Sequence, residues 1–149
     1  KKRIFASYSL ETGKSKSLPI HLPEQYWDKK LDLSKLFLTS GTVDKSGFTY
    51  LFSGSPFIFR YDFQTQKVTS YEVHPTWEKA KADDIPFGSM SASQKQAFMR
   101  ENPFYYKIYF DPYRNLYYRL SSPPRPNATE ENFHYVNYNR ICLTVLDKE

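Results

Sequence analysis

Segment 101–120 contains the residues best suited to bind a ligand, because eight aromatic side chains are interleaved there with lysine and arginine. Tyrosine rings stack on sugars or bases, and arginine pairs with carboxylates. The candidate binding residues are Tyr113, Arg114, Tyr117 and Arg119. In a competing structural interpretation, Tyr118 and Leu120 face the core. Tyr117 and Arg119 then cover a neighbouring sheet, and this interpretation is favoured because buried aromatic side chains stabilise β cores.

The three histidines of the chain do not predict a metal site. His21, His74 and His134 are separated by 53 and 60 residues. Metal sites combine several converging ligands, usually with short internal spacing. His21 and His74 each follow a strand-like run, which favours a structural position at the end of a strand. No metal or other cofactor is predicted.

Two acidic pairs and one cysteine could act in catalysis, but their settings argue against it. Asp83-Asp84 and Glu130-Glu131 lie in loop-like stretches, whereas glycosidase chemistry needs two carboxylates that face each other across a bond. Cys142 is the only cysteine, and its apolar surroundings match no nucleophile motif. With 5 glycines in the chain, no glycine-rich phosphate loop is present either. We predict no catalytic residue.

The composition is typical of a globular chain and excludes several classes of protein. Hydrophobic residues make up 40% of the 149 residues and aromatic residues 18%, and aromatic side chains favour strands. The net charge of +5 comes from 21 basic and 16 acidic residues that are spread along the chain. Nucleic-acid binding needs a basic patch, so no nucleic-acid partner is expected. No apolar run approaches the roughly 18 residues of a transmembrane segment.

Two segments have the alternating pattern of a β-hairpin. In residues 4–20 the turn contains Gly13, which can supply the positive φ of a tight connection. In residues 57–73 the aromatic side chains fall on one face and Arg60 falls on the other. A shift of 53 residues superposes the segments, with five identities in the 14 positions 8–21. A period of this length is typical of propellers and other repeat arrays.

A second unit, in which a turn leads into a strand, occurs twice. Asp44 and Asp111 are expected to open these turns by accepting hydrogen bonds from nearby backbone. Gly47 and Asn115 are expected to close them in the left-handed conformation. The resulting order of turns and strands suits a four-stranded antiparallel blade.

Two segments lack the strand pattern. A short helix is expected at 94–100, capped by Ser91 or Ser93, each of which has a glutamine three residues on, and stopped by Pro103. The proline-rich segment 121–132 is expected to be a semi-rigid surface loop.

The predicted fold is all-β: a partial β-propeller of about two and a half four-stranded antiparallel blades with one short helical insertion. We interpret residues 1–149 as a single all-β domain and a fragment of a larger propeller, because a ring needs four to eight blades. Its parts are the outer hairpin of blade one (3–21), blade two (36–73), a helix-containing insertion (76–102) and an incomplete blade three (104–149). The alternative is a complete β-sandwich of about seven strands.

Residues 102–106 and 111–119 resemble a family of uncharacterised proteins from Bacteroidetes. These are mostly predicted lipoproteins with a six-bladed β-propeller-like domain of unknown function. Their recurrent feature is an aspartate, a Tyr-Arg pair and a Tyr-Tyr-Arg strand, matched here by Asp111, Tyr113, Arg114, Tyr117, Tyr118 and Arg119. The ending 141–148 resembles the strand that closes with Leu-Asp and a charged turn. The resemblance implies a propeller and a location in the cell envelope, in the periplasm or on the outer surface, with no established activity.

The expected function is binding of a glycan, a peptide or an envelope protein by a non-enzymatic propeller module. The alternative is a glycan-processing enzyme whose active site is completed by blades absent from this chain, because propellers support both classes. Carboxylates or histidines that converge at the central axis would distinguish the two. We also expect self-association through exposed strand edges. The chain has no initiator methionine and no signal peptide, which we interpret as a sign of an excised chain.

Overall fold

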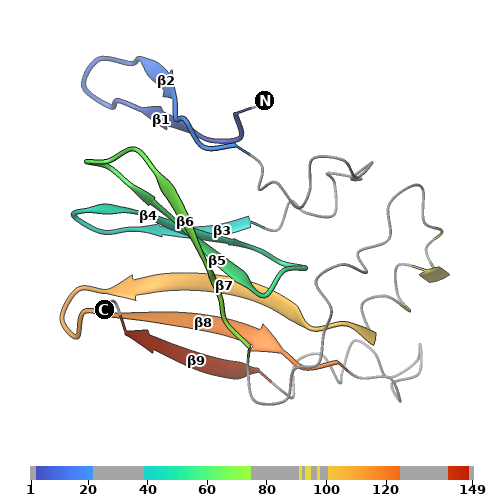
Figure 1. Cartoon of the computed structure of the whole chain (residues 1–149). Helices are drawn as coiled ribbons and strands as arrows, with labels where there is room; N and C mark the ends of the chain where they lie inside the picture. The colour runs from blue at the N-terminus through green and yellow to red at the C-terminus, as the bar shows by residue number, and fades with distance from the viewer. Residues whose placement is uncertain are drawn as a thin grey trace.

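The computed structural model describes residues 3–21, 39–74, 91, 93–94, 97, 101–124 and 141–147. These residues form three antiparallel sheets, as the sequence predicts for an all-β protein (Figure 1). The first is a hairpin of β1 (Ala6–Tyr8) and β2 (Ser15–Ser17). The second is a four-stranded sheet of β3 (Thr39–Val43), β4 (Gly47–Phe52), β5 (Phe57–Asp62) and β6 (Val68–Glu72), in that order. The third is a three-stranded sheet of β7 (Phe104–Asp111), β8 (Leu116–Ser122) and β9 (Cys142–Asp147).

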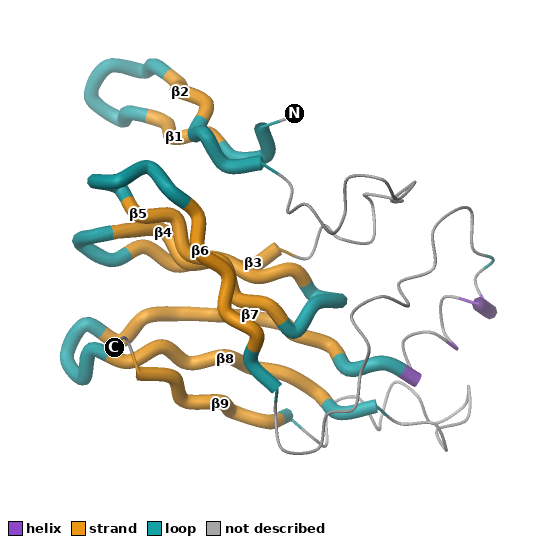
Figure 2. The backbone as a smooth tube through the Cα atoms, viewed as in Figure 1, coloured by secondary structure: helices purple, strands orange, loops and turns teal. Residues whose placement is uncertain are grey.

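The sheets lie in layers, with the four-stranded sheet in the middle (Figures 1 and 2). The hairpin covers one face of this sheet, where Ile20 packs with Tyr50, Phe52, Phe59 and Tyr61. The three-stranded sheet covers the other face, where Leu51 and Ile58 meet Tyr105, Ile108 and Tyr117. Strand alternation explains both layers, because successive side chains of β4 and β5 point to opposite faces.

Aromatic rings fill the layer between the hairpin and the four-stranded sheet. Tyr50 is completely buried and stacks on Phe59 with ring centroids 5.3 Å apart. Phe5 of the hairpin meets the edge of the same tyrosine ring at 4.9 Å. Each such pair contributes about 0.5–1.5 kcal/mol to stability, in addition to the contribution from the apolar area that it buries. These aromatic side chains therefore build the core of this layer.

Polar side chains join the two larger sheets along β3 and β7. The Ser40 hydroxyl accepts a hydrogen bond from the Ile108 N–H (3.0 Å) and lies within donating distance of the Ile108 carbonyl (3.4 Å). Thr42 accepts a hydrogen bond from the Phe110 N–H at 3.2 Å. Because each strand lies at the edge of its own sheet, these bonds satisfy backbone groups that strand pairing leaves open.

Three described turns begin with an aspartate, and the sequence predicts two of them, Asp44 and Asp111. Asp44 accepts hydrogen bonds from the backbone N–H groups that follow it, one of them from Ser46 at 2.7 Å. Asp62 and Asp111 act in the same way at 2.6 and 2.9 Å. Asn115 has a φ of 56°, as predicted.

The prediction for Gly47 is wrong, because this glycine is not among the residues with positive φ. Its role is steric. A Cβ atom at this position would lie 2.5 Å from the Tyr61 carbonyl oxygen and 3.1 Å from the Arg60 guanidinium. The close approach of β4 and β5 therefore requires a residue without a side chain.

The hairpins β1–β2 and β5–β6 pair in the same register. Tyr8 pairs with Ser15, and Tyr61 pairs with Val68, so both members of the pair are displaced by 53 residues. Their turns also match: Gly13 has a φ of 67°, and the residue 53 positions later, Gln66, has a φ of 57°. The superposition inferred from the sequence therefore corresponds to equivalent hydrogen bonding.

The helix start agrees with the capping-box prediction and selects Ser91 rather than Ser93. Ser91 Oγ accepts a hydrogen bond from the Gln94 N–H (3.3 Å), and Gln94 Oε1 accepts one from the Ser91 N–H (2.8 Å). The described residues Ser93, Gln94, Ala97 and Glu101 are helical. No helix in the described part of the chain is long and apolar enough to cross a membrane.

Some predicted boundaries differ from the observed ones. Ser121 and Ser122 belong to β8 and not to the expected loop, of which positions 125–132 lie outside the described residues. The last described strand of the predicted blade three is β9. The predicted blade two, which begins at 36, is described only from Thr39 onwards. The stacked sheets are compatible with the sandwich alternative as well as with consecutive blades.

Candidate binding site between the sheets

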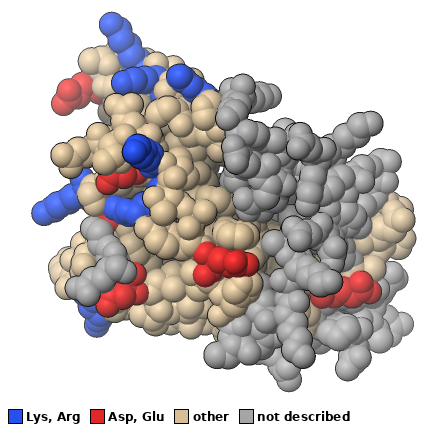
Figure 3. Space-filling model, in the orientation of Figure 1, with Lys and Arg blue, Asp and Glu red and all other residues tan. Residues whose placement is uncertain are grey.

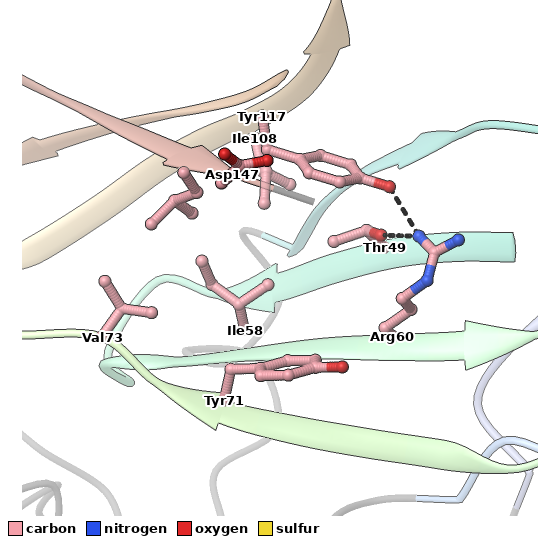
Figure 4. Close-up of a pocket in the computed structure, with 9 residues that line it drawn as sticks. Thr49, Ile58, Arg60, Tyr71, Val73, Ile108, Tyr117 and Asp147 are labelled. Atoms are coloured by element: carbon pink, nitrogen blue, oxygen red, sulfur yellow. Dashed lines mark hydrogen bonds between the residues drawn. The ribbon is translucent and has the colours of Figure 1, made fainter. Parts of the chain in front are cut away.

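A cavity of about 210 Å³ lies between the four-stranded and the three-stranded sheet (Figure 4). It is lined by Thr49, Ile58, Arg60, Tyr71, Val73, Ile108, Tyr117, Leu146 and Asp147. Six strands on two sheets, β4 to β9, supply all of these side chains except that of Val73. Tyr71 and Asp147 are exposed and lie where the cavity reaches solvent. A space of this size accepts a group as large as a benzene ring.

The polar end of the cavity is a network centred on Arg60. Its Nη1 donates to Asp44 Oδ2 and Thr49 Oγ1, both at 2.9 Å, and to the Tyr117 hydroxyl at 2.5 Å. Its Nη2 donates to Asp44 Oδ1 at 3.1 Å and to Ser46 Oγ at 2.8 Å. Tyr117 in turn donates to Asp44 Oδ2, so the network links β8 to the turn between β3 and β4.

Mutual neutralisation fixes the ionisation of these groups. Burial by itself would raise the pKa of the Asp44 carboxyl, but hydrogen bonds from Arg60, Tyr117 and Ser46 hold that pKa well below its usual range. Burial and the hydrogen bond to Asp44 raise the pKa of the Tyr117 phenol. The carboxylate is therefore ionised and the phenol neutral at pH 7, so Tyr117 can act as the donor.

This network leaves little charge for a ligand. The Asp44 side chain is 1% exposed and the Arg60 side chain 16% exposed, and each compensates the other. The bonds to Asp44, Thr49, Ser46 and Tyr117 already engage both terminal nitrogens of the guanidinium. The cavity is consequently suited to an apolar group rather than to an anion.

A second arginine ties the sheets together next to the cavity. Arg119 is completely buried and donates to the carbonyl oxygens of Pro56 (3.0 Å) and Val73 (2.9 Å). Its guanidinium lies over the Tyr105 ring, 4.5 Å from the centroid, where the ring face attracts a cation. The side chain thus crosses from β8 to the open end of the β5–β6 hairpin, where β5 begins and β6 ends.

The four predicted binding residues are not on one surface. Tyr113 is 95% exposed in the turn between β7 and β8. Arg114 lies beside it and pairs with Asp111 at 2.9 Å. Tyr117 and Arg119 are buried and face the four-stranded sheet, which agrees with that half of the structural interpretation. Tyr118 and Leu120, which the same interpretation turned to the core, are half-buried and belong to neither cluster of buried hydrophobic residues.

Sequence reasoning missed Asp44 and Thr49 as partners of Arg60. One signal was available: Arg60 lies on the same face of its strand as Ile58, which is an apolar position. A charged side chain there must find a partner across the interface, because an unpaired buried charge is costly. The identity of that partner could not be read from the local sequence.

The groups considered for metal binding or catalysis do not converge in the described part of the chain. There, no three His, Cys, Asp or Glu side chains are arranged to hold a metal ion. His74 Nε2 pairs with Glu72 Oε1 at 2.8 Å on the surface, and His21 forms a β-bridge with Arg3. Cys142 is half-buried in β9. His134 and the pairs at 83–84 and 130–131 lie outside the described residues.

On the face shown in Figure 3, the visible Lys and Arg side chains lie over the hairpin and at the end of the sheets where the short turns lie. Acidic side chains lie among them and also farther along the sheets.

The fold and the cavity together define an all-β protein of stacked antiparallel sheets in which Asp44 and Arg60 form a buried ion pair. Residues 1–149 match the family described as Domain of unknown function (DUF4221), and the protein belongs to this family. A crystal structure of a DUF4221 family member from Bacteroides vulgatus ATCC 8482 is similar over 95% of this chain, with a TM-score of 0.64 and 24% sequence identity. The match covers 40% of that chain, so the present chain spans less than half the length of this relative. No curated protein matches the chain.

Proposed function

We propose that the chain is part of a β-propeller protein of the cell envelope that binds a glycan, a peptide or an envelope protein without catalysing a reaction. The propeller proposal is supported by the face-to-face layers and by the equal register of the hairpins β1–β2 and β5–β6. In this arrangement β3 and β7 are neighbouring inner strands of consecutive blades. The envelope location is supported by the resemblance to predicted lipoproteins.

One observation carries the non-enzymatic proposal: the Asp44 carboxylate and the Arg60 guanidinium, which meet between the sheets, neutralise each other. Asp44 and Arg60 form a buried pair, and Tyr117 completes it. General acid–base chemistry needs a group within reach of a substrate proton, with a pKa near the working pH. The depressed pKa of Asp44 and the raised pKa of Tyr117 place both groups far from that range.

The exposed turn between β7 and β8 supports a binding role. Tyr113 offers a ring that is 95% exposed, and the Arg114 side chain beside it is 70% exposed. Tyrosine provides a large contact area at low entropic cost, and tyrosine and arginine are enriched among residues that dominate interfaces. We infer that this turn contributes to the binding surface of the full-length protein.

The test is binding by the full-length protein to arrays of glycans and peptides and to purified envelope components. Tyr113→Ala and Arg114→Ala should each weaken capture several-fold, since hot-spot side chains contribute more than about 1 kcal/mol. Tyr8→Ala is the matched control, because Tyr8 is 63% exposed on a different sheet. Turnover of any captured glycan or peptide would refute the non-enzymatic proposal, and equal effects of all three variants would refute the role of this turn.

A further inference from the structure

Three tight turns of the two larger sheets lie together at one end of the molecule (Figure 1): 44–46, 63–67 and 112–115. The first two are joined by a hydrogen bond from the Phe63 N–H to the Ser46 carbonyl oxygen at 3.0 Å. The third lies next to the first, because β3 and β7 run side by side and Thr42, near the end of β3, bonds to the Phe110 N–H, near the end of β7. We refer to these three turns as the turn face.

The carboxylates at the base of the turn face are directed into the turns. The Asp44 side chain is 1% exposed within its ion pair. Asp62 accepts hydrogen bonds from the N–H and the hydroxyl group of Thr65, at 2.6 and 2.9 Å. Asp111 accepts one from the Tyr113 N–H at 2.9 Å, and its side chain is 13% exposed. These contacts hold the negative charges close to the backbone of the turns.

The cations of the turn face are exposed, and each turn carries one: Lys45, Lys67 and Arg114. Figure 3 shows Lys and Arg side chains at this end of the sheets. Arg114 pairs with Asp111, whereas the two lysines have no ion-pair partner in the described part of the chain. The exposed carboxylate of Asp147 ends β9, which β7 and β8 separate from the turns that carry the lysines. The unpaired positive charge of this face is therefore at Lys45 and Lys67.

Two aromatic rings accompany these cations. Tyr113 is 95% exposed and directly precedes Arg114, and Phe63 is 44% exposed in the same turn as Lys67. A sugar ring has an apolar face of C–H groups that can stack on an aromatic side chain, which offers a large rigid contact area. An acidic sugar adds a carboxylate or phosphate group, with which lysine forms charge-assisted hydrogen bonds. Rings and cations together therefore match a chain of charged sugars.

We propose that the turn face binds an anionic oligosaccharide. Phe63 and Tyr113 stack on its sugar rings. Lys45 and Lys67 pair with its carboxylate or phosphate groups. This inference rests on the proposed binding role of the turn between β7 and β8, and it names the class of ligand. A peptide matches less well, because peptides are bound along strand edges or in grooves, whereas the turn face consists of the ends of paired strands.

The test is titration of the full-length protein with oligogalacturonate, its methyl ester, a phosphorylated oligomannose and polyglutamate. Oligogalacturonate and its ester share a sugar backbone and differ in charge. The protein should bind one of the two anionic sugars at least about tenfold more tightly than the neutral ester, because charge-assisted hydrogen bonds are stronger than neutral ones. This preference should weaken as salt is added. The tighter of the two anionic sugars identifies the anionic group as carboxylate or phosphate.

Variants assign the binding to the turn face. Lys45→Gln combined with Lys67→Gln should weaken binding of the preferred anionic sugar about tenfold and leave binding of the ester unchanged. Phe63→Leu should weaken binding of both sugars about threefold, because it keeps an apolar side chain but removes the ring face. Lys107→Gln is the matched control, since Lys107 is also exposed but lies within β7, away from the turns. It should change neither affinity.

Equal affinities for the anionic sugars and the neutral ester would overturn the proposal, as would an effect of Lys107→Gln as large as that of the double lysine variant. Tighter binding of polyglutamate than of either anionic sugar would assign the turn face to an acidic protein and would also overturn it. Capture of neutral glycans or peptides through Tyr113 would retain the proposed binding role and refute only this inference. A protein that captures no probe and no array component would refute both.

Discussion

Replacement of Arg60 by alanine tests whether the network between the sheets stabilises the fold. The variant removes the cationic partner of a carboxylate that is 1% exposed and leaves Asp44 with neutral donors, the Tyr117 hydroxyl and the N–H groups of Ser46 and Gly47. Removing one member of a buried ion pair costs about 3–5 kcal/mol, because the remaining charge is buried without compensation. For a domain of this size, each kcal/mol lowers Tm by roughly 2–4 °C.

Arg114→Ala provides a control at an ion pair of the same length. The Arg114–Asp111 pair is also 2.9 Å long, but the Arg114 side chain is 70% exposed, compared with 16% for Arg60. Exposed pairs contribute about 0–1 kcal/mol. The two variants share the chemical change and the length of the ion pair, and differ in burial and in the number of hydrogen bonds that the guanidinium donates.

Urea unfolding measures the free energies of the wild type and both variants, with unchanged m-values as the sign that the unfolding reaction is the same. Tyr117→Phe extends the experiment by removing only the hydroxyl group, and should lower the free energy of unfolding by about 1–3 kcal/mol. A double-mutant cycle of Arg60→Ala and Tyr117→Phe should be non-additive, because both residues bond the same carboxylate oxygen. The reasoning is refuted when Arg60→Ala and Arg114→Ala destabilise the protein by equal amounts.

Two further predictions concern acid and the β4–β5 contact. The folded protein holds the pKa of Asp44 below its unfolded value of about 3.9, so the unfolded chain binds more protons in acid. The contribution of Asp44 to stability is thus complete above about pH 4 and is lost as pH falls. In urea titrations, the difference in free energy of unfolding between wild type and Arg60→Ala should therefore narrow between about pH 4 and 2. A difference that stays constant over this range would contradict the reasoning. Gly47→Ala should lower the free energy of unfolding by about 1–3 kcal/mol, because the added methyl group meets the Tyr61 carbonyl oxygen. A change below about 0.5 kcal/mol in thermal unfolding would show that β4 and β5 can move apart without loss of stability.

Local rules predicted much of this fold. Alternation along residues 57–62 assigned the two faces of β5 correctly, because a strand has a period of two residues whatever its surroundings. The aspartate turns and the capping box at Ser91 were also predictable, since each is closed within a few residues of chain.

The candidate site was less predictable, because its contacts depend on which sheets pack together. Arg60 and Tyr117 are 57 residues apart, and Tyr117 and Asp44 are 73 residues apart. The failure at Gly47 has a similar origin: the sequence suggested a left-handed turn, whereas the constraint is the backbone of the neighbouring strand. Patterns along one strand give no information on what approaches it from another.

The Tyr-Tyr-Arg strand that carries the family resemblance packs the three-stranded sheet against the four-stranded sheet. Tyr117 and Arg119 are two residues apart, so they share a face of β8, and that face meets the four-stranded sheet. One reaches the Asp44–Arg60 pair, and the other reaches two carbonyl groups at the open end of the β5–β6 hairpin. Such a motif fixes how neighbouring sheets are joined.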